Sequence, residues 1–138
     1  MMLLKIISGA ALLVTCSACA APLPEHDLDM AWIDVQSQGG HQLSAQRMDG
    51  AKVDDARYFQ TSPGEHELQM RLTYDRSGSS TGDSQRRCRI NITYAGYQAG
   101  QRYSIRALAK GWTVRAWLYS SDGQRLIESK PIRCGSQY

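Results

Sequence analysis

Apolar and polar residues alternate along several stretches of the chain. In Cys88–Tyr94 every second side chain is apolar, and the same period recurs in Tyr103–Ala107. Successive side chains of a β-strand point to opposite faces, so this period predicts strands with one buried and one wetted face. Trp112–Tyr119 is apolar in both phases, which predicts an inner strand that is covered on both sides. Glu65–Tyr74 alternates over its whole length and predicts the most regular strand.

Weaker alternation marks the remaining strands. The sequence predicts them at Met30–Gln36, Gln42–Met48, Gln124–Ser129 and Ile132–Cys134, and it leaves Lys52–Gln60 without a clear pattern. Turn residues lie between the predicted strands. They are Gly39-Gly40, Asp49-Gly50, Ser62-Pro63-Gly64, Gly96, Gly100 and Ser120–Gly123. No stretch shows a sustained helical period, so the expected fold is all-β: an antiparallel β-sandwich, or a small open barrel, of about seven to eight strands with little helix.

The apolar phases of these strands predict one core between two sheets. Its expected members are His66, Leu68, Met70, Leu72, Ile90, Ile92, Tyr103, Ile105, Val114 and Leu118. The segment Asp75–Arg86 is polar and rich in serine and glycine. It has little to bury, so we expect a mobile hairpin loop there.

The beginning of the chain has the composition of an export signal. Lys5 supplies a positive charge, and Ile6–Val14 is an apolar run that is too short to span a bilayer comfortably. We interpret residues 1–18 as a lipoprotein signal peptide and leave them out of the fold. Residues 19–30 are expected to be a tether, and residues 31–138 a single β-domain with one core.

Two cysteines follow small residues at the end of this signal. Leu13-Val-Thr-Cys16 and Ser17-Ala18-Cys19 resemble the lipobox of bacterial lipoproteins, in which a cysteine becomes the lipidated first residue of the mature chain. The resemblance implies lipid attachment at Cys19, with Cys16 as second choice. The following residue, Ala20, is not aspartate, which by resemblance to enterobacterial sorting implies an anchor in the outer membrane and a domain facing the periplasm. Ordinary cleavage after Ala20, which would release a soluble periplasmic protein, is the alternative.

The other two cysteines, Cys88 and Cys134, form an even pair in an oxidising compartment. This predicts a disulfide between them. It would close a loop of about 46 residues, for which chain entropy indicates at most roughly 4 kcal/mol of stabilisation. Two free thiols are the alternative, and a metal site is disfavoured because no further ligand spacing accompanies the pair.

Candidate catalytic residues are few. Asp54 and Asp55 are adjacent, so they would point to opposite faces of a strand or cap backbone amides in a turn. His66 is expected at the edge of the core with a hydrogen bond to backbone, whereas His26 and His41 lie in loop-like sequence without a second metal-binding residue at useful spacing. We therefore expect no metal, no cofactor and no enzymatic activity.

Charge and aromatic residues suggest two binding surfaces. The formal charge is +3, or 16 − 1 − 13 = +2 without the lysine of the signal peptide. This is too small to indicate nucleic acid or an anionic surface as partner. Arg115, Trp117 and Tyr119 occupy the strand phase that the core does not need, and arginine and aromatic side chains are common in interface hot spots. Arg87 and Arg89 share the outer face of another strand, either opposite Glu65 or Glu67 or in contact with an acidic partner, lipopolysaccharide or phospholipid headgroups.

A family resemblance covers roughly residues 61–126. It rests on Pro63-Gly64-Glu-His66-Glu-Leu68, Ile90-Asn-Ile92-Thr-Tyr-Ala95, Gly100-Gln-Arg-Tyr103-Ser-Ile105, Trp112 and Asp122-Gly123. This pattern resembles small, uncharacterised envelope lipoproteins of Gram-negative bacteria, with a PGxHxhxh strand, an AxxGxxYxh hairpin and a tryptophan strand, where h is apolar. The resemblance implies a β-domain in the envelope and no catalytic residues.

Two functions are therefore expected in order of preference. The first is an outer-membrane lipoprotein that acts as a non-catalytic binding or structural module, with an envelope protein or glycan as partner. The second is a periplasmic inhibitor or immunity protein that blocks a cell-wall hydrolase such as a lysozyme, acting through a loop such as Asp75–Arg86.

Overall fold

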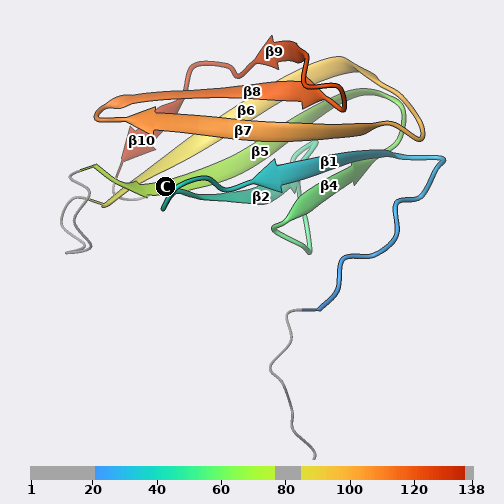
Figure 1. Ribbon diagram of the computed structural model, residues 1–138, viewed down its shortest axis with the longest axis horizontal. Coiled ribbons are helices and arrows are strands. Elements are labelled where there is room, and N and C mark those ends of the chain that lie inside the picture. The colour runs from blue at the N-terminus through green and yellow to red at the C-terminus, as the bar shows by residue number, and fades with distance from the viewer. Residues whose placement is uncertain (1–20, 77–84, 136–138) are drawn as a thin grey trace, which may run out of the picture.

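The computed structural model describes residues 21–76 and 85–135, and these form two five-stranded sheets packed face to face without helix (Figure 1). The first sheet has the order β4 (Tyr58–Thr61), β1 (Ala31–Gln36), β7 (Arg102–Lys110), β8 (Thr113–Ser120) and β9 (Arg125–Glu128). The second has the order β10 (Arg133–Gly135), β6 (Gln85–Tyr97), β5 (Gly64–Asp75), β2 (Gln42–Met48) and β3 (Ala51–Lys52). The predicted β-sandwich is confirmed.

The pairing is antiparallel except at one place. β1 runs parallel to β7, with Ile33 opposite Tyr103 and Val35 opposite Ile105. Residues 37–101 build β4 and most of the second sheet before the chain returns to β7, so β1 and β7 become neighbours across a long crossover. The strand periods carry no information about this pairing, and the sequence did not predict a parallel pair.

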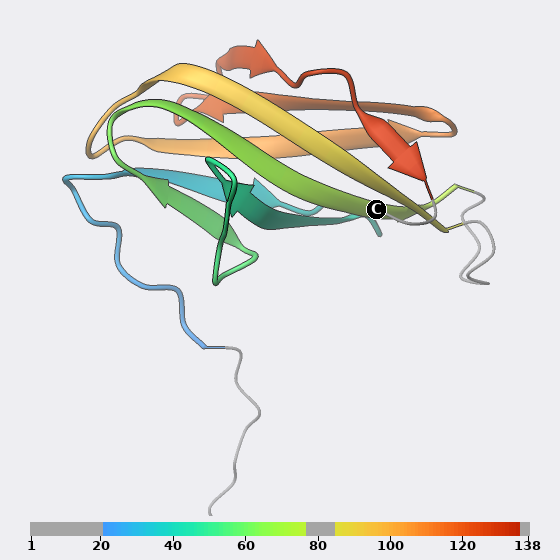
Figure 2. The ribbon, with the colours of Figure 1, turned by 180° about the vertical axis from the view of Figure 1, so that it is seen from behind.

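The long hairpin of β5 and β6 forms the middle of the second sheet (Figure 2). Leu68 lies opposite Ile92, and Met70 opposite Ile90, so apolar side chains meet in cross-strand pairs on the inner face. The inner face of the first sheet packs against them and completes one core. The fully or almost fully buried members include Ile33, Phe59, Leu68, Met70, Leu72, Ile90, Ile92, Ile105 and Leu118. His66 and Val114, which were expected in this core, are only half-buried.

The disulfide joins neighbouring strands of the second sheet. Cys88 on β6 lies directly opposite Cys134 on β10, with 4.0 Å between their Cα atoms and 2.03 Å between the sulfur atoms. This is the pair that the sequence predicts. Because β10 has only three residues, the covalent bond is what holds it beside β6 against fraying.

Two residues near strand ends lie elsewhere than predicted. Trp112 does not continue the core-facing phase of β8 but lies in the turn before it, with its side chain 67% exposed. Gly96 is not in a turn either, because β6 continues to Tyr97. A Cβ at Gly96 would lie 2.6 Å from the hydroxyl oxygen of Tyr94, so a close approach explains this glycine.

The segment with no clear pattern, Lys52–Gln60, contributes to both sheets as the short β3 and as β4. Asp49 and Gly50 both have positive φ, 50° and 84°, which fits the turn that their sequence predicts between β2 and β3. Asp54 and Asp55 lie in the loop after β3, as expected, and Asp55 accepts hydrogen bonds from Arg57.

Residues 21–30 approach the sandwich along β4. The Asp27 backbone N–H donates to Gln60 Oε1 at 3.0 Å, and Arg57 donates to the Ala21 carbonyl at 2.7 Å. This segment enters at the start of β1, at the end of the sandwich opposite the β7–β8 turn (Figures 1 and 2). Cys16, Cys19 and the signal segment lie outside the described residues.

Candidate functional site

The three residues Arg115, Trp117 and Tyr119 share the outer face of β8, as their sequence phase predicts. Between them, Ala116 and Leu118 point into the core. Trp117 is nevertheless only 8% exposed, because arginine side chains cover its ring. The guanidinium of Arg115 lies 4.8 Å from the ring centroid and that of Arg125 on β9 lies 4.4 Å from it.

A second aromatic group occupies the other end of the same face. Trp32 on β1 stacks on Tyr58 of β4, with ring centroids 4.2 Å apart and an angle of 9° between the planes. Trp32 is 1% exposed, and its indole N–H donates to Asp34 Oδ1 at 2.7 Å. The guanidinium of Arg102 lies 5.2 Å from the Trp32 ring.

Arg106 on β7 connects the two groups. Its guanidinium lies 4.8 Å from the Tyr119 ring, and its Nε donates to Gln36 Oε1 at 3.1 Å. We call the whole surface the arginine–aromatic face. It comprises Trp32, Tyr58, Arg102, Arg106, Arg115, Trp117, Tyr119 and Arg125.

The arginine–aromatic face carries excess positive charge. Its four arginines face two carboxylates, those of Asp34 and Glu128, which leaves 4 − 2 = +2. Arg115 pairs with Glu128 at 3.0 Å, and this pair lowers the pKa of Glu128 and raises that of Arg115. Arg106 and Arg125 take part in no ion pair within the described residues.

A guanidinium that stacks on a ring keeps its N–H groups at its edge, where they can donate to a carboxylate in a fixed geometry. A hollow of about 280 Å³ lies beside two of these arginines. Its lining consists of Asp34, Gln36, Arg102, Tyr103, Ser104, Arg106, Ser120, Ser121 and Gly123. Arginine, serine and amide groups together can hold an anionic or polar group, so the arrangement suits recognition of an acidic ligand.

Arg87 and Arg89 lie elsewhere, on the outer face of the second sheet. The expectation that they oppose Glu65 or Glu67 is wrong, because Arg87 lies opposite Thr73 and Arg89 opposite Arg71. The strand phases were read correctly, but the register of the hairpin depends on its turn and cannot be taken from one strand alone. The candidate binding residues therefore belong to two separate faces of the sandwich.

His66 lies between a serine and an aspartate. Its Nδ1 donates to Asp49 Oδ2 at 2.6 Å, and its Nε2 lies 2.8 Å from the Ser62 carbonyl oxygen and 3.1 Å from Ser62 Oγ. Both ring nitrogens thus have partners in neighbouring turns, and His66 joins the β2–β3 turn to the β4–β5 turn.

The bond to backbone that was expected for His66 is confirmed, and the contact with Asp49 was not predicted. Within the described residues, no group of three His, Cys, Asp or Glu side chains could hold a metal ion. In the same part of the chain, no helix is long and apolar enough to cross a membrane.

Sequence reasoning missed five of the eight residues of the arginine–aromatic face, on β1, β4, β7 and β9. The alternation of Arg102, Ser104 and Arg106 was a usable signal for an outward polar phase on β7. That these arginines lie beside Trp32 and Tyr119 follows only from strand order and register.

The Asp49–His66 contact predicts a pH dependence of stability. The pKa of Asp49 lies below its ordinary value of 3.8, chiefly because of the His66 hydrogen bond and then because of the Glu67 backbone N–H. The resulting stability is fully present above that ordinary pKa and is lost as the pH falls through the lowered, folded-state value. We expect D49N to melt about 2–5 °C below the wild type at pH 6, and the difference to shrink as the pH falls below the ordinary pKa of 3.8 and through the lowered one.

Thermal unfolding across this pH range measures the effect, with D54N as a control that removes the same charge from an exposed loop. Equal melting temperatures of D49N and wild type at pH 6 would contradict the role of this contact. A difference in melting temperature that persists unchanged at the lowest pH would also contradict it.

Comparisons with protein-family models, with curated proteins and with solved structures find no match to this chain.

Proposed function

We propose that this chain is an envelope lipoprotein whose β-sandwich is a non-catalytic binding module. In this proposal Cys19 carries the lipid and anchors the domain at the outer membrane, facing the periplasm. The arginine–aromatic face binds an acidic envelope partner, either a protein or a glycan with carboxylate groups. Residues 21–30 enter at one end of the sandwich, where the His26 ring lies 5.9 Å from the ring of Trp32 on this face.

One observation carries the binding role: the guanidinium groups of Arg115 and Arg125 lie over Trp117 on a face that the core does not use. Stacking on an aromatic ring reduces the freedom that an arginine loses when it binds. Aromatic and arginine side chains are also the residues that supply most binding energy in known interfaces.

A second candidate function is inhibition of a cell-wall hydrolase such as a lysozyme. The hollow beside Arg102 and Arg106 favours it, because glycoside hydrolases act through a pair of carboxyl groups that guanidinium groups can pair with. The loop from Asp75 to Arg86, which was the expected inhibitory element, lies for the most part outside the described residues.

Lipid anchoring predicts where the protein fractionates. We expect C19A to move the domain from the membrane fraction to the soluble periplasmic fraction, because the acyl chains would have no attachment point. C16A is the matched control and should stay with the membrane. Release by C16A in place of C19A, or retention of both variants, would contradict attachment at Cys19.

The binding role predicts that loss of two arginines on one face abolishes capture of a partner. We expect R106Q/R125Q to lower capture from solubilised envelopes about tenfold or more, since each charge-assisted hydrogen bond contributes about 1.5–3 kcal/mol. Quantitative pull-down with the full lipidated chain measures this. Added salt should weaken capture by the wild type, because the contacts are between exposed charges.

The control is R71Q/R133Q, which removes the same charge from the second sheet. If both double mutants lost capture of the partner equally, the loss would be due to the lower net charge, and the proposal that one specific face binds the partner would be contradicted. A lysozyme activity assay with the same variants separates the two functions, since only an inhibitor lowers hydrolysis and only R106Q/R125Q should then restore it.

A further inference from the structure

The strand β9, Arg125–Glu128, forms one edge of the first sheet. It pairs with β8 on one side, and within the described residues no backbone hydrogen bond joins it to another segment on the other side. In both overall views β9 lies at the rim of the molecule (Figures 1 and 2). The N–H and C=O groups at the open side of an edge strand are a template for pairing with a further strand.

The other three edges of the sandwich are shorter or accompanied. β3 has two residues and β10 has three. β4 has four residues, but the segment 21–30 follows it, with the Asp27 N–H bonded to Gln60 and Arg57 bonded to the Ala21 carbonyl. Among the described strands, β9 is therefore the longest edge that no other segment accompanies.

The two charged residues of β9 lie on the outer face of the sheet. Arg125 and Glu128 stand directly opposite the outward residues Tyr119 and Trp117 of β8. Residues three positions apart point to opposite faces of a regular strand. Here the register shifts between Leu118 and Tyr119, and this bulge brings the arginine and the glutamate to the same face.

The two residues between them are apolar and point to the inner side. Leu126 packs against the core, and Ile127 lies opposite the buried Leu118. Ile127 remains 37% exposed, because no further strand covers it at the edge. Along β9 the side chains therefore follow the order outer, inner, inner, outer.

This order makes β9 complementary to a second copy of itself. In an antiparallel pair, Arg125 of each copy lies opposite Glu128 of the other, and Leu126 lies opposite Ile127. Every residue then meets either the opposite charge or another aliphatic side chain, on the same face of the sheet. Cross-strand pairs of these kinds stabilise antiparallel sheets.

Both charged groups have capacity for this contact. The guanidinium of Arg125 lies 4.4 Å from the ring centroid of Trp117 and, within the described residues, takes part in no ion pair. Stacking on a ring leaves its N–H groups available at the edge. Glu128 accepts a hydrogen bond from Arg115 at 3.0 Å, and an ionised carboxylate has lone pairs for further donors.

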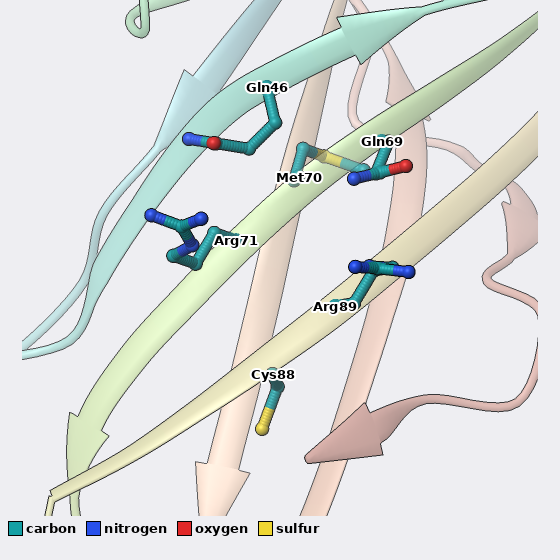
Figure 3. Close-up of a pocket in the computed structure, with 6 residues that line it drawn as sticks. All are labelled: Gln46, Gln69, Met70, Arg71, Cys88 and Arg89. Atoms are coloured by element: carbon teal, nitrogen blue, oxygen red, sulfur yellow. The ribbon is translucent and has the colours of Figure 1, made fainter. Parts of the chain in front are cut away.

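The outer face of the second sheet offers no comparable contact. Its hollow of about 30 Å³ has room for little more than a water molecule, and Figure 3 shows Gln46, Gln69, Arg71 and Arg89 around it. Among the large apolar residues of the described strands, those with exposed side chains are Leu108 and Ile127, and both belong to the first sheet.

We propose that the chain forms a two-fold symmetric dimer in which β9 pairs antiparallel with β9 of a second copy. The axis passes between Leu126 and Ile127, so each copy contributes the same edge, as a two-fold interface requires. The first sheets of the two copies become one continuous sheet, and their arginine–aromatic faces lie side by side on it. This dimer does not depend on the acidic partner proposed for that face.

Four residues make a small interface, so we expect weak self-association in solution. The lipid anchor proposed above would raise the effective concentration of the chains in the plane of the membrane.

Sedimentation equilibrium of the full chain carrying C16A and C19A, which remove both candidate acylation sites, tests the dimer. The chain should show a concentration-dependent equilibrium between monomer and dimer. R125E and E128R each place like charges opposite each other at both ends of the paired strands. Each should therefore lower the association constant about tenfold or more.

An equimolar mixture of R125E and E128R is the decisive arm. In a heterodimer of these two variants, each reversed charge meets the opposite charge on the other copy. The mixture should therefore associate within about threefold of the wild-type constant. K52E is the control, because it reverses a charge on the edge strand β3 of the second sheet, and it should change the constant less than about twofold.

Thermal unfolding checks that each variant folds. If a charge reversal unfolds the monomer, R125Q and E128Q replace the reversed pair. Each should weaken association, and their mixture should recover part of it, because one of the two ion pairs is restored. The proposal is overturned if the wild type stays monomeric at every concentration, if the reversed variants fail to associate when mixed, or if K52E weakens association as much as R125E.

Discussion

The packing of two apolar inner faces is the constraint on which the rest of this structure depends. Pleating sends alternate side chains of β5 and β6 into the space that the first sheet closes from the other side, and the buried ones are aliphatic, sulfur-containing or aromatic. The opposite phase of every inner strand must then point outward. Arginines occupy that phase on β5, β6, β7 and β8, so the core determines where the candidate binding groups lie.

Both outer faces of the sandwich carry several arginines, but the neighbours of these arginines differ between the two sheets. On the first sheet, aromatic rings separate and support the arginines, and ion pairs with Asp34 and Glu128 balance part of the charge. On the second sheet, Arg71 lies opposite Arg89, and Arg89 lies opposite Arg133. The small net charge of the chain conceals this arrangement, because acids such as Asp49 and Asp55 lie at turns and are engaged there.

Much of the fold could be predicted because each strand of a sandwich carries its own period. The alternation in Glu65–Tyr74 identified β5 and the buried residues Leu68, Met70 and Leu72. The phases of Trp112–Tyr119 placed Arg115 and Trp117 on the outer face of β8. Trp112 was misplaced because an apolar residue next to a strand extends its pattern whether or not the backbone has already turned. The parallel pairing of β1 with β7, the opposition of Arg71 and Arg89, and the contact of Arg125 with Trp117 depend on strand order and register, which no single segment encodes.

The central claim is that arginines on the outer face of the first sheet cover Trp117 closely enough to exclude solvent. Acrylamide quenching of a chain carrying W32F and W112F, in which Trp117 is the only tryptophan, tests it most directly. The account predicts weak quenching and a blue-shifted emission, as for a buried indole, with both lost when Arg115 and Arg125 are replaced by alanine. Strong quenching in the presence of both arginines would contradict it.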